Sequence, residues 1–128
     1  MNGKRKAIVP PGIHTAGPYS PAIRAGDFLF VSGQIPVGPS GELVRGGIED
    51  QARQCLENLR AVLSAAGADF PHLVKVTIYL TDMGDFDAVN RIYAEYFDLE
   101  PPARACVQVG ALPKGARLEI EALAYLGD

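Results

Sequence analysis

The chain has 128 residues, of which 48% are hydrophobic and 21% charged, and its formal net charge is -3. This length predicts one domain spanning residues 1–128, long enough to bury a core without disulfides or a metal. The mild negative charge argues against nucleic-acid binding, because such proteins usually carry a basic face, and no run approaches the ~20 apolar residues of a membrane-spanning helix.

The first third of the chain is rich in glycine and proline. Of the 14 glycines and 10 prolines, 14 residues fall between Pro10 and Gly47, a composition that is typical of a flexible linker. Residues 28–35 (FLFVSGQI) nevertheless predict a strand, apolar on both faces at its start as an inner strand would be. A shorter strand is expected at residues 7–9. We therefore expect this stretch to belong to the folded domain.

The middle of the chain predicts two helices with a strand between them. Apolar residues recur at three- and four-residue steps over residues 48–66, which is typical of an amphipathic helix, and Gly67 can end it in a left-handed conformation. Residues 73–80 (LVKVTIYL) predict a strand. Asp85 can cap a second helix, whose apolar positions run over residues 86–97.

Two further strands are expected at residues 103–109 and 117–125, joined by the segment GALPKGA. Two helices for about five strands predict an α+β domain in which both helices cover one face of the sheet. The other face then needs a cover of its own, and partner subunits are the simplest candidate.

The last two strands carry the candidate chemistry. If they pair as a hairpin that buries their apolar rows together, then Arg104, Cys106, Glu119 and Glu121 share one face. The guanidinium of Arg104 could hold a carboxylate and favour the thiolate of Cys106, while a neighbouring glutamate could orient or deprotonate a water. The same pattern also fits a structural Arg–Glu pair beside a half-buried cysteine, and such ion pairs are commoner than active sites.

Asn90 is a second candidate on the predicted second helix. It lies four residues after Phe86 and three before Tyr93, so helical spacing places it on the apolar side. An amide there must find hydrogen-bond partners, either within the structure or in a pocket. The spacing leaves both alternatives open.

The sequence indicates neither a metal nor a cofactor. His14 and His72 have no cysteine or histidine at ligand spacing, and the chain has no phosphate-binding glycine motif or dinucleotide fingerprint. Cys55 and Cys106 are isolated thiols, which fits a reducing compartment. We therefore expect a cytoplasmic protein without cofactors.

The run PARACVQVGALPKGARLEIEALA (residues 102–124) closely resembles the signature of the Rid family, the reactive intermediate deaminases that are also called YjgF-like proteins. Other blocks are similar to this family in the same order: GPYSPAI, VSGQIPV, QARQCLENLRAVLSAAGA, VKVTIYLTDM and DFDAVNRIYAEYF. The resemblance covers essentially the whole chain beyond the first dozen residues.

The resemblance implies a chorismate-mutase-like α+β fold with a mixed sheet, assembled as a homotrimer with three clefts between subunits. It also implies hydrolysis of reactive 2-imino and enamine acids, such as 2-iminobutanoate, 2-iminopropanoate and 2-aminoacrylate, to 2-keto acids and ammonia. An imine conjugated to a carboxylate is already electrophilic, so this chemistry requires neither a metal nor a cofactor.

Six residues match the family's site positions. The resemblance implies that Arg104 holds the substrate carboxylate and that Glu119 positions the water. The substrate-binding positions are matched by Tyr19, Ser32, Asn90 and Cys106. Without the resemblance, Tyr19 could simply pack on a neighbour and Ser32 could simply bond a backbone carbonyl. Glu121 is not a matched position, and we interpret it as a structural or solvent-facing charge.

Other functions are compatible with the same residues. A non-catalytic, small-acid-binding regulatory trimer would use Arg104 to bind carboxylates without turnover. An RNA-acting translation inhibitor is disfavoured by the net charge of -3. A stress holdase on the same fold is neither favoured nor excluded by the sequence.

Overall fold

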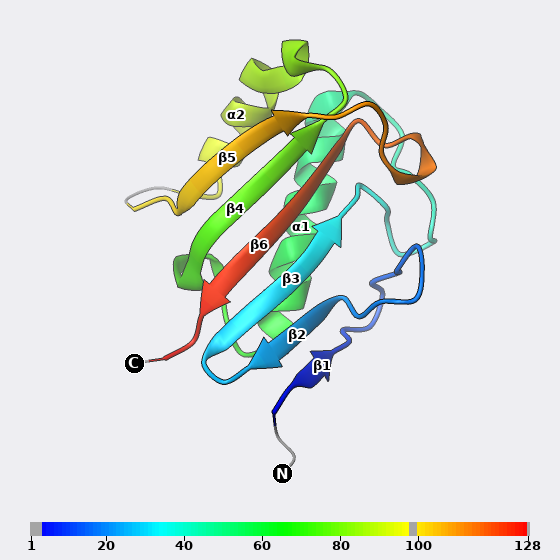
Figure 1. The fold of residues 1–128 in the computed structure, drawn as a ribbon. Helices are drawn as coiled ribbons and strands as arrows, with labels where there is room; N and C mark the ends of the chain where they lie inside the picture. The colour runs from blue at the N-terminus through cyan, green and yellow to red at the C-terminus, as the bar shows by residue number, and fades with distance from the viewer. Residues whose placement is uncertain (1–3, 98–99, 128) are drawn as a thin grey trace.

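A six-stranded sheet organises the fold, with the strand order β1-β2-β3-β6-β4-β5 (Figure 1). The structure is a computed structural model that describes residues 4–97 and 100–127. Its strands are β1 (Lys6–Ile8), β2 (Ala22–Ala25), β3 (Phe28–Gln34), β4 (Leu73–Leu80), β5 (Ala103–Gln108) and β6 (Leu118–Tyr125). Its α-helices are α1 (Ile48–Ala65) and α2 (Phe86–Ala94), and neither is long and apolar enough to cross a membrane.

The sheet is mixed. All neighbouring strands run antiparallel except β4 and β5, which are parallel and are joined through α2. A parallel pair needs such a crossover, because the chain must return to the same end of the sheet before the second strand begins. The expected α+β class is therefore confirmed.

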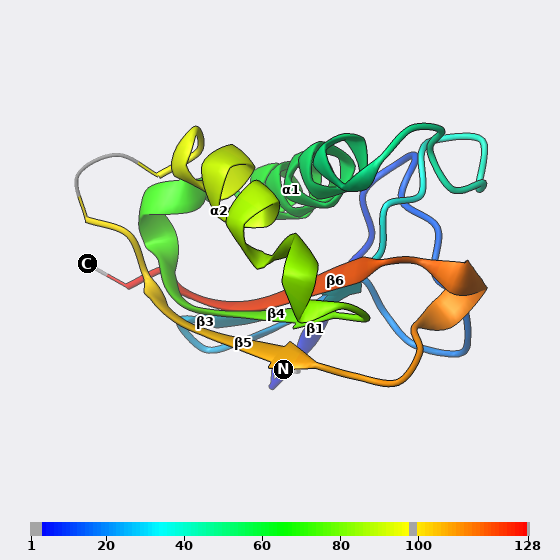
Figure 2. The same ribbon diagram turned by 90° about the horizontal axis from the view of Figure 1, so that it is seen from above.

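Both helices lie on the same face of the sheet, as the ratio of helices to strands predicted (Figure 2). The core lies between these two layers. It includes the fully buried side chains of Leu29, Cys55, Leu56, Leu59, Val62, Leu63, Val76, Leu80, Leu118 and Ile120. The opposite face has no cover from the described residues. It exposes Phe28, Phe30, Val107 and Tyr125, which are 39–51% accessible.

Helix α1 forms as the spacing predicts. Its apolar stripe is buried against the sheet, and Glu49 and Asp50 in the first turn suit the positive end of the helix dipole. Past its end, Gly67 has φ = +76°, the left-handed conformation that glycine adopts without a steric cost. The amide of Gly67 donates to the carbonyl of Ser64, which confirms the predicted terminus.

Three local predictions were wrong. The short strand β2 was not among the expected strands. Asp85 does not cap α2 with its side chain, and its carboxylate instead accepts two hydrogen bonds from Arg117, at 2.8 and 2.9 Å. The alternation of residues 73–80 predicts that Val74 shares a face with Val76, Ile78 and Leu80, but Val74 is 43% exposed and the β4–β6 register shifts between Leu73 and Lys75.

The predicted hairpin of the last two strands does not form. Strand β4 lies between β5 and β6, parallel to the first and antiparallel to the second. Arg104 and Cys106 are the β5 partners of Val76 and Ile78, two core residues, so they face the helices. The apolar row of β5, which we expected to be buried in a hairpin, faces the open side of the sheet instead.

The two glutamates of β6 lie on the other side of the sheet. Glu119 pairs with Tyr79 and Glu121 with Thr77, positions that alternate with the buried residues of β4. Paired residues on neighbouring strands point to the same face. The expectation that Arg104 and Cys106 share a face with Glu119 and Glu121 is therefore wrong.

Candidate functional site

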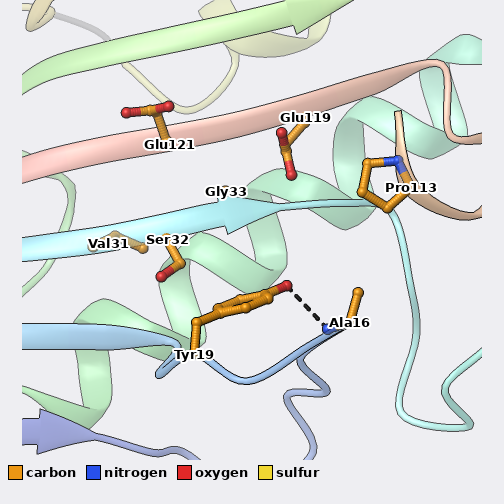
Figure 3. Close-up of a pocket in the computed structure, with 8 residues that line it drawn as sticks. All are labelled: Ala16, Tyr19, Val31, Ser32, Gly33, Pro113, Glu119 and Glu121. Carbon is orange, nitrogen blue, oxygen red and sulfur yellow. Dashed lines mark hydrogen bonds between the residues drawn. The ribbon is translucent and has the colours of Figure 1, made fainter. Parts of the chain in front are cut away.

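An open pocket of about 480 Å³ lies on the sheet face that the helices leave uncovered (Figure 3). Strands β3 and β6, the loop before β2 and the loop between β5 and β6 form its walls. The lining residues are Ala16, Tyr19, Val31, Ser32, Gly33, Pro113, Glu119 and Glu121. Three of the residues predicted for the site, Tyr19, Ser32 and Glu119, therefore lie together.

Glu119 lies directly against the backbone of Gly33. A Cβ atom at Gly33 would be only 2.5 Å from Cδ of Glu119 and 2.6 Å from its Oε2. The close approach occurs where the β3–β6 register is interrupted, between Val31 and Gln34. Glycine within a strand commonly marks such a bulge or a close contact. The absence of a side chain at position 33 thus makes room for the carboxylate.

The environment of Glu119 favours its protonated form. Burial raises the pKa of Glu119 above its ordinary value, and the nearby Glu121 carboxylate raises it further. Both effects act in the same direction, because burial and a neighbouring negative charge each disfavour the ionised form of a carboxyl group. A carboxyl group with a raised pKa is suited to exchanging a proton with a bound water.

Replacing Gly33 with alanine should displace Glu119 and lower the activity of the site. The new methyl group would occupy the space of the Glu119 carboxylate, so that side chain or the bulge must move. An equivalent Gly47→Ala change meets no atom within 4 Å and serves as the control. Steady-state kinetics of both variants, with circular dichroism to confirm folding, tests this; equal activities would contradict the packing of Glu119 against Gly33.

Tyr19 makes a hydrogen bond within the loop before β2, and Ser32 links that loop to β3. The Tyr19 hydroxyl accepts a hydrogen bond from the amide of Ala16 at 3.0 Å, which leaves its own proton available to a ligand (Figure 3). The Ser32 hydroxyl donates to the carbonyl of Ser20 at 2.6 Å, and the Ser32 amide donates to Pro21. Ser32 thus has the structural bond that the sequence left open, and it also lines the pocket.

Arg104 belongs to a second cluster, on the helix side of the sheet. Its guanidinium carbon lies 4.8 Å from the ring centroid of Tyr93 and 5.6 Å from that of Phe86, both on α2. Such cation–π contacts hold a guanidinium in place without using its hydrogen-bond donors. None of the ion pairs among residues 4–97 and 100–127 involves Arg104. Its fork is therefore suited to receive a carboxylate.

Asn90 and Cys106 are the other members of this cluster. Asn90 is half-buried on α2, and helical spacing places it between Phe86 and Tyr93 on the same side. Cys106 is half-buried and packs against the core. Burial raises the pKa of Cys106, while Arg104 lowers it as its position predicted; the effect of burial is the larger one.

Within one chain, the six predicted residues thus form two groups on opposite faces of the sheet. Tyr19, Ser32 and Glu119 line the open pocket. Arg104 and Cys106 lie on β5 and face the helices, and Asn90 lies on α2. Among the described residues, no group of three or more His, Cys, Asp or Glu side chains is arranged to hold a metal ion.

Sequence reasoning missed two residues of the pocket region. Gly33 carried a usable signal, because an isolated glycine within a strand pattern suggests close backbone approach. Tyr79 donates a hydrogen bond to Oε1 of Glu121 at 2.7 Å. Tyr79 could be found only by knowing that β4 neighbours β6.

Comparison with known proteins places the chain among relatives of the same length. The profile of the endoribonuclease L-PSP family matches residues 11–126. A human 2-iminobutanoate/2-iminopropanoate deaminase is 51% identical over 112 residues, which are 87% of this chain and 82% of that protein. A RutC family protein of Pyrococcus horikoshii is 56% identical over 110 residues, 85% of this chain and 87% of that protein.

Solved structures agree with these matches. E. coli TdcF with bound serine is 41% identical and superposes with a TM-score of 0.90, over 95% of this chain and 99% of TdcF. The YjgF gene product of E. coli is 38% identical with a TM-score of 0.88, over 94% of this chain and 98% of that one. By sequence and by structure, this chain belongs to the endoribonuclease L-PSP family, the Rid and YjgF-like family that its sequence blocks resemble.

Proposed function

We propose that this protein hydrolyses reactive 2-imino and enamine acids to 2-keto acids and ammonia, with 2-iminobutanoate, 2-iminopropanoate and 2-aminoacrylate as its substrates. The observation that carries the proposal is the half-buried Glu119 carboxyl, whose pKa is raised, in an open pocket of about 480 Å³. The human relative that is 51% identical to this chain is named a 2-iminobutanoate/2-iminopropanoate deaminase, which supports the same chemistry.

The proposed site is shared between two copies of the chain. Arg104 faces the helices and Glu119 faces away from them, so one chain cannot present both to a small substrate. A neighbouring copy that covers the open face could bring its own Arg104 to the pocket. Each cleft would then combine Arg104, Asn90 and Cys106 of one subunit with Tyr19, Ser32 and Glu119 of the next.

A homotrimer with the chorismate-mutase-like arrangement of three clefts would provide this geometry. The open face supports such an assembly, because the exposed rings of Phe28, Phe30 and Tyr125 cluster at one end of it, with the ring centroid of Phe28 6.5 Å from that of Phe30 and 5.3 Å from that of Tyr125. A contiguous apolar surface of this kind is characteristic of an interaction site. A closed ring of three copies would bury that surface and repeat the same cleft at each interface.

The mechanism uses the imine's own reactivity. The Arg104 fork would bind the substrate carboxylate with two charge-assisted hydrogen bonds. Glu119 would remove a proton from a bound water while the oxygen attacks the C=N carbon, and would pass this proton to the imine nitrogen. Glu119 would then take the hydroxyl proton of the resulting carbinolamine and deliver it to the amine, so that the C–N bond breaks, ammonia leaves and the 2-keto acid forms. Holding the two reactants in place can contribute several kcal/mol toward the barrier.

In this mechanism Cys106 is a lining residue of the cleft. Its pKa is raised by burial, which disfavours the nucleophilic thiolate form. Asn90 and Tyr19 would complete the polar lining with an amide and a hydroxyl. The two free thiols among the described residues, Cys55 and Cys106, support the cytoplasm as the proposed location.

The charge of the pocket favours this function over an RNA-directed one. The family description names an endoribonuclease, but this pocket presents two carboxylates, Glu119 and Glu121, on a chain with a net charge of -3. A phosphodiester backbone would be repelled by both. A non-catalytic small-acid-binding trimer remains the alternative, and it predicts carboxylate binding through Arg104 without turnover.

A coupled assay tests the proposed activity. A purified threonine dehydratase releases 2-iminobutanoate, and the protein should accelerate the appearance of 2-ketobutyrate in proportion to its concentration. A rate equal to the uncatalysed hydrolysis would contradict the deaminase function. Carboxylate binding without acceleration would support the regulatory alternative.

Placing a charge on the open face should dissociate the proposed trimer. Phe30 is 51% exposed in the single chain, and Phe30→Asp would bury a carboxylate at the interface. Light scattering should give three times 13.6 kDa for the unmodified protein and for Val9→Asp, an exposed control, but a lower mass for Phe30→Asp. A mass of one chain for the unmodified protein would contradict the trimer.

A further inference from the structure

Tyr79 and Glu121 form a hydrogen-bonded pair beside Glu119 that the proposed mechanism does not use. Tyr79 is the cross-strand partner of Glu119, but its hydroxyl donates to Oε1 of Glu121, at 2.7 Å. Glu119 and Glu121 are two residues apart on β6, so both carboxylates point to the same face and line the same pocket (Figure 3). The three side chains are therefore one cluster on neighbouring strands.

The two carboxylates have unequal surroundings. Glu121 accepts a hydrogen bond from Tyr79, which fixes its carboxylate on the pocket side of the sheet. Among the described residues, no side chain or backbone group donates a hydrogen bond to Glu119. Glu119 is also the less exposed of the two. Tyr79 thus holds the Glu121 carboxylate beside Glu119, and the burial of Glu119 together with this neighbour raises the pKa of Glu119.

We propose that Tyr79 and Glu121 are positioning residues that keep a fixed negative charge beside Glu119, and so make Glu119 the carboxyl that exchanges the proton of the reaction. This inference rests on the proposed function of Glu119 as the group that activates water. Pairs of carboxylates whose environments push their proton affinities apart are a common way to separate acid and base roles.

The other groups that face Glu119 do not compete with this effect. Gly33 and Ser32 on β3 are neutral, and Tyr19 in the loop before β2 adds a phenol. On β4, the charged Lys75 lies four residue pairs away from Tyr79, opposite Leu123. Among residues 4–97 and 100–127, neither glutamate forms an ion pair within 4 Å.

The Tyr79 phenol keeps its proton in this arrangement. Its hydrogen bond to Glu121 raises the pKa of Tyr79, because loss of the proton would leave two anions in contact. Tyr79 therefore acts as a donor across the accessible pH range. Its effect on Glu119 is expected to pass through Glu121.

The titration of Glu119 tests the pair directly, without a substrate. Carbon-13 NMR of the side-chain carboxyls, with the Glu119 signal assigned from a Glu119→Gln spectrum, follows its ionisation. Glu121→Gln should lower the pKa of Glu119, because it removes the like charge but keeps the side-chain size. Tyr79→Phe should alter the Glu119 titration when Glu121 is present and have no effect in the Glu121→Gln background. Tyr125→Phe, an exposed tyrosine of the same face, is the matched control.

The same variants should move the pH dependence of deamination. Glu119 must be ionised to take a proton from water, so a raised pKa places the acidic limb of kcat/KM at higher pH. Glu121→Gln should shift that limb to lower pH. A structural role for Glu121 would change the rate at every pH and leave the limb in place.

Two results would overturn the inference. One is an unchanged pKa of Glu119 in Glu121→Gln, and the other is an equal effect of Tyr79→Phe in both backgrounds. Failure of the proposed function is distinguishable, because it would abolish deamination by the unmodified protein and leave the NMR titrations as predicted.

Discussion

Replacing Arg104 with alanine is expected to lower kcat/KM for 2-ketobutyrate formation by about 100-fold or more. The loss of a bidentate, charge-assisted anchor in a desolvated cleft costs about 3 kcal/mol or more, and each 1.4 kcal/mol is a factor of ten. Arg104→Lys should recover part of the loss, since it restores the charge but not the planar fork. The coupled dehydratase assay measures both variants.

The control for this prediction is another arginine that is paired at the surface. Arg91 is exposed and forms an ion pair with Glu49 at 2.8 Å. It has no role in the proposed mechanism, so the Arg91→Ala variant should keep its activity. Full activity of Arg104→Ala would contradict the assignment of the substrate carboxylate to this residue.

Glu119→Gln is expected to lower kcat by about 100-fold to 10,000-fold with little change in KM. General-base catalysis contributes rate enhancements of this size, and the amide keeps the shape of the carboxyl but cannot accept the proton of water. Glu95→Gln is the matched control, because Glu95 is an exposed glutamate paired with Arg53. A large increase in KM with unchanged kcat would assign Glu119 to binding instead.

Binding of the product separates the two roles. Calorimetry with 2-ketobutyrate should detect binding to Glu119→Gln and none to Arg104→Ala, because only Arg104 is proposed to contact the carboxylate. If Glu119→Gln also retained its full rate, the protein would fit the regulatory alternative better than the deaminase.

The sequence predicted those elements whose signals are local. The three- and four-residue spacing of α1 and the glycine that follows it predicted that helix, since both depend on neighbours along the chain. The alternation of β6 predicted that Glu119 and Glu121 share a face, whereas that of β4 failed at Val74, where the register shifts. Strand β2 was missed because its four residues, enclosed by Pro21 and Gly26, are too few to show a period.

The order of strands in the sheet could not be predicted in the same way. A period of two defines the two faces of a strand but does not identify the neighbouring strand. We assumed that β5 and β6 pair as a hairpin. Instead, α2 carries the chain back so that β5 lies parallel to β4. This single difference places Arg104 and Glu119 on opposite faces of the sheet, and it is the reason for proposing a site that two copies share.

The glycine- and proline-rich first third also has a different role from the one its composition suggested. It contains β2 and β3 as well as the loop that carries Tyr19 into the pocket. Gly33 lies against Glu119 there, because only a residue without a side chain leaves space for the Glu119 carboxylate. Composition alone could not show this, since the contact joins residues that are distant in the sequence.

Complementation between two inactive variants tests most directly that one cleft uses Arg104 of one copy and Glu119 of another. Arg104→Ala and Glu119→Gln chains would be unfolded together in equal amounts, refolded and assayed. Random mixing in a trimer leaves one intact cleft in each mixed assembly, so about a quarter of the unmodified activity should return. Activity that stays at the level of the separate variants, in trimers shown by mass to be mixed, would contradict the shared site.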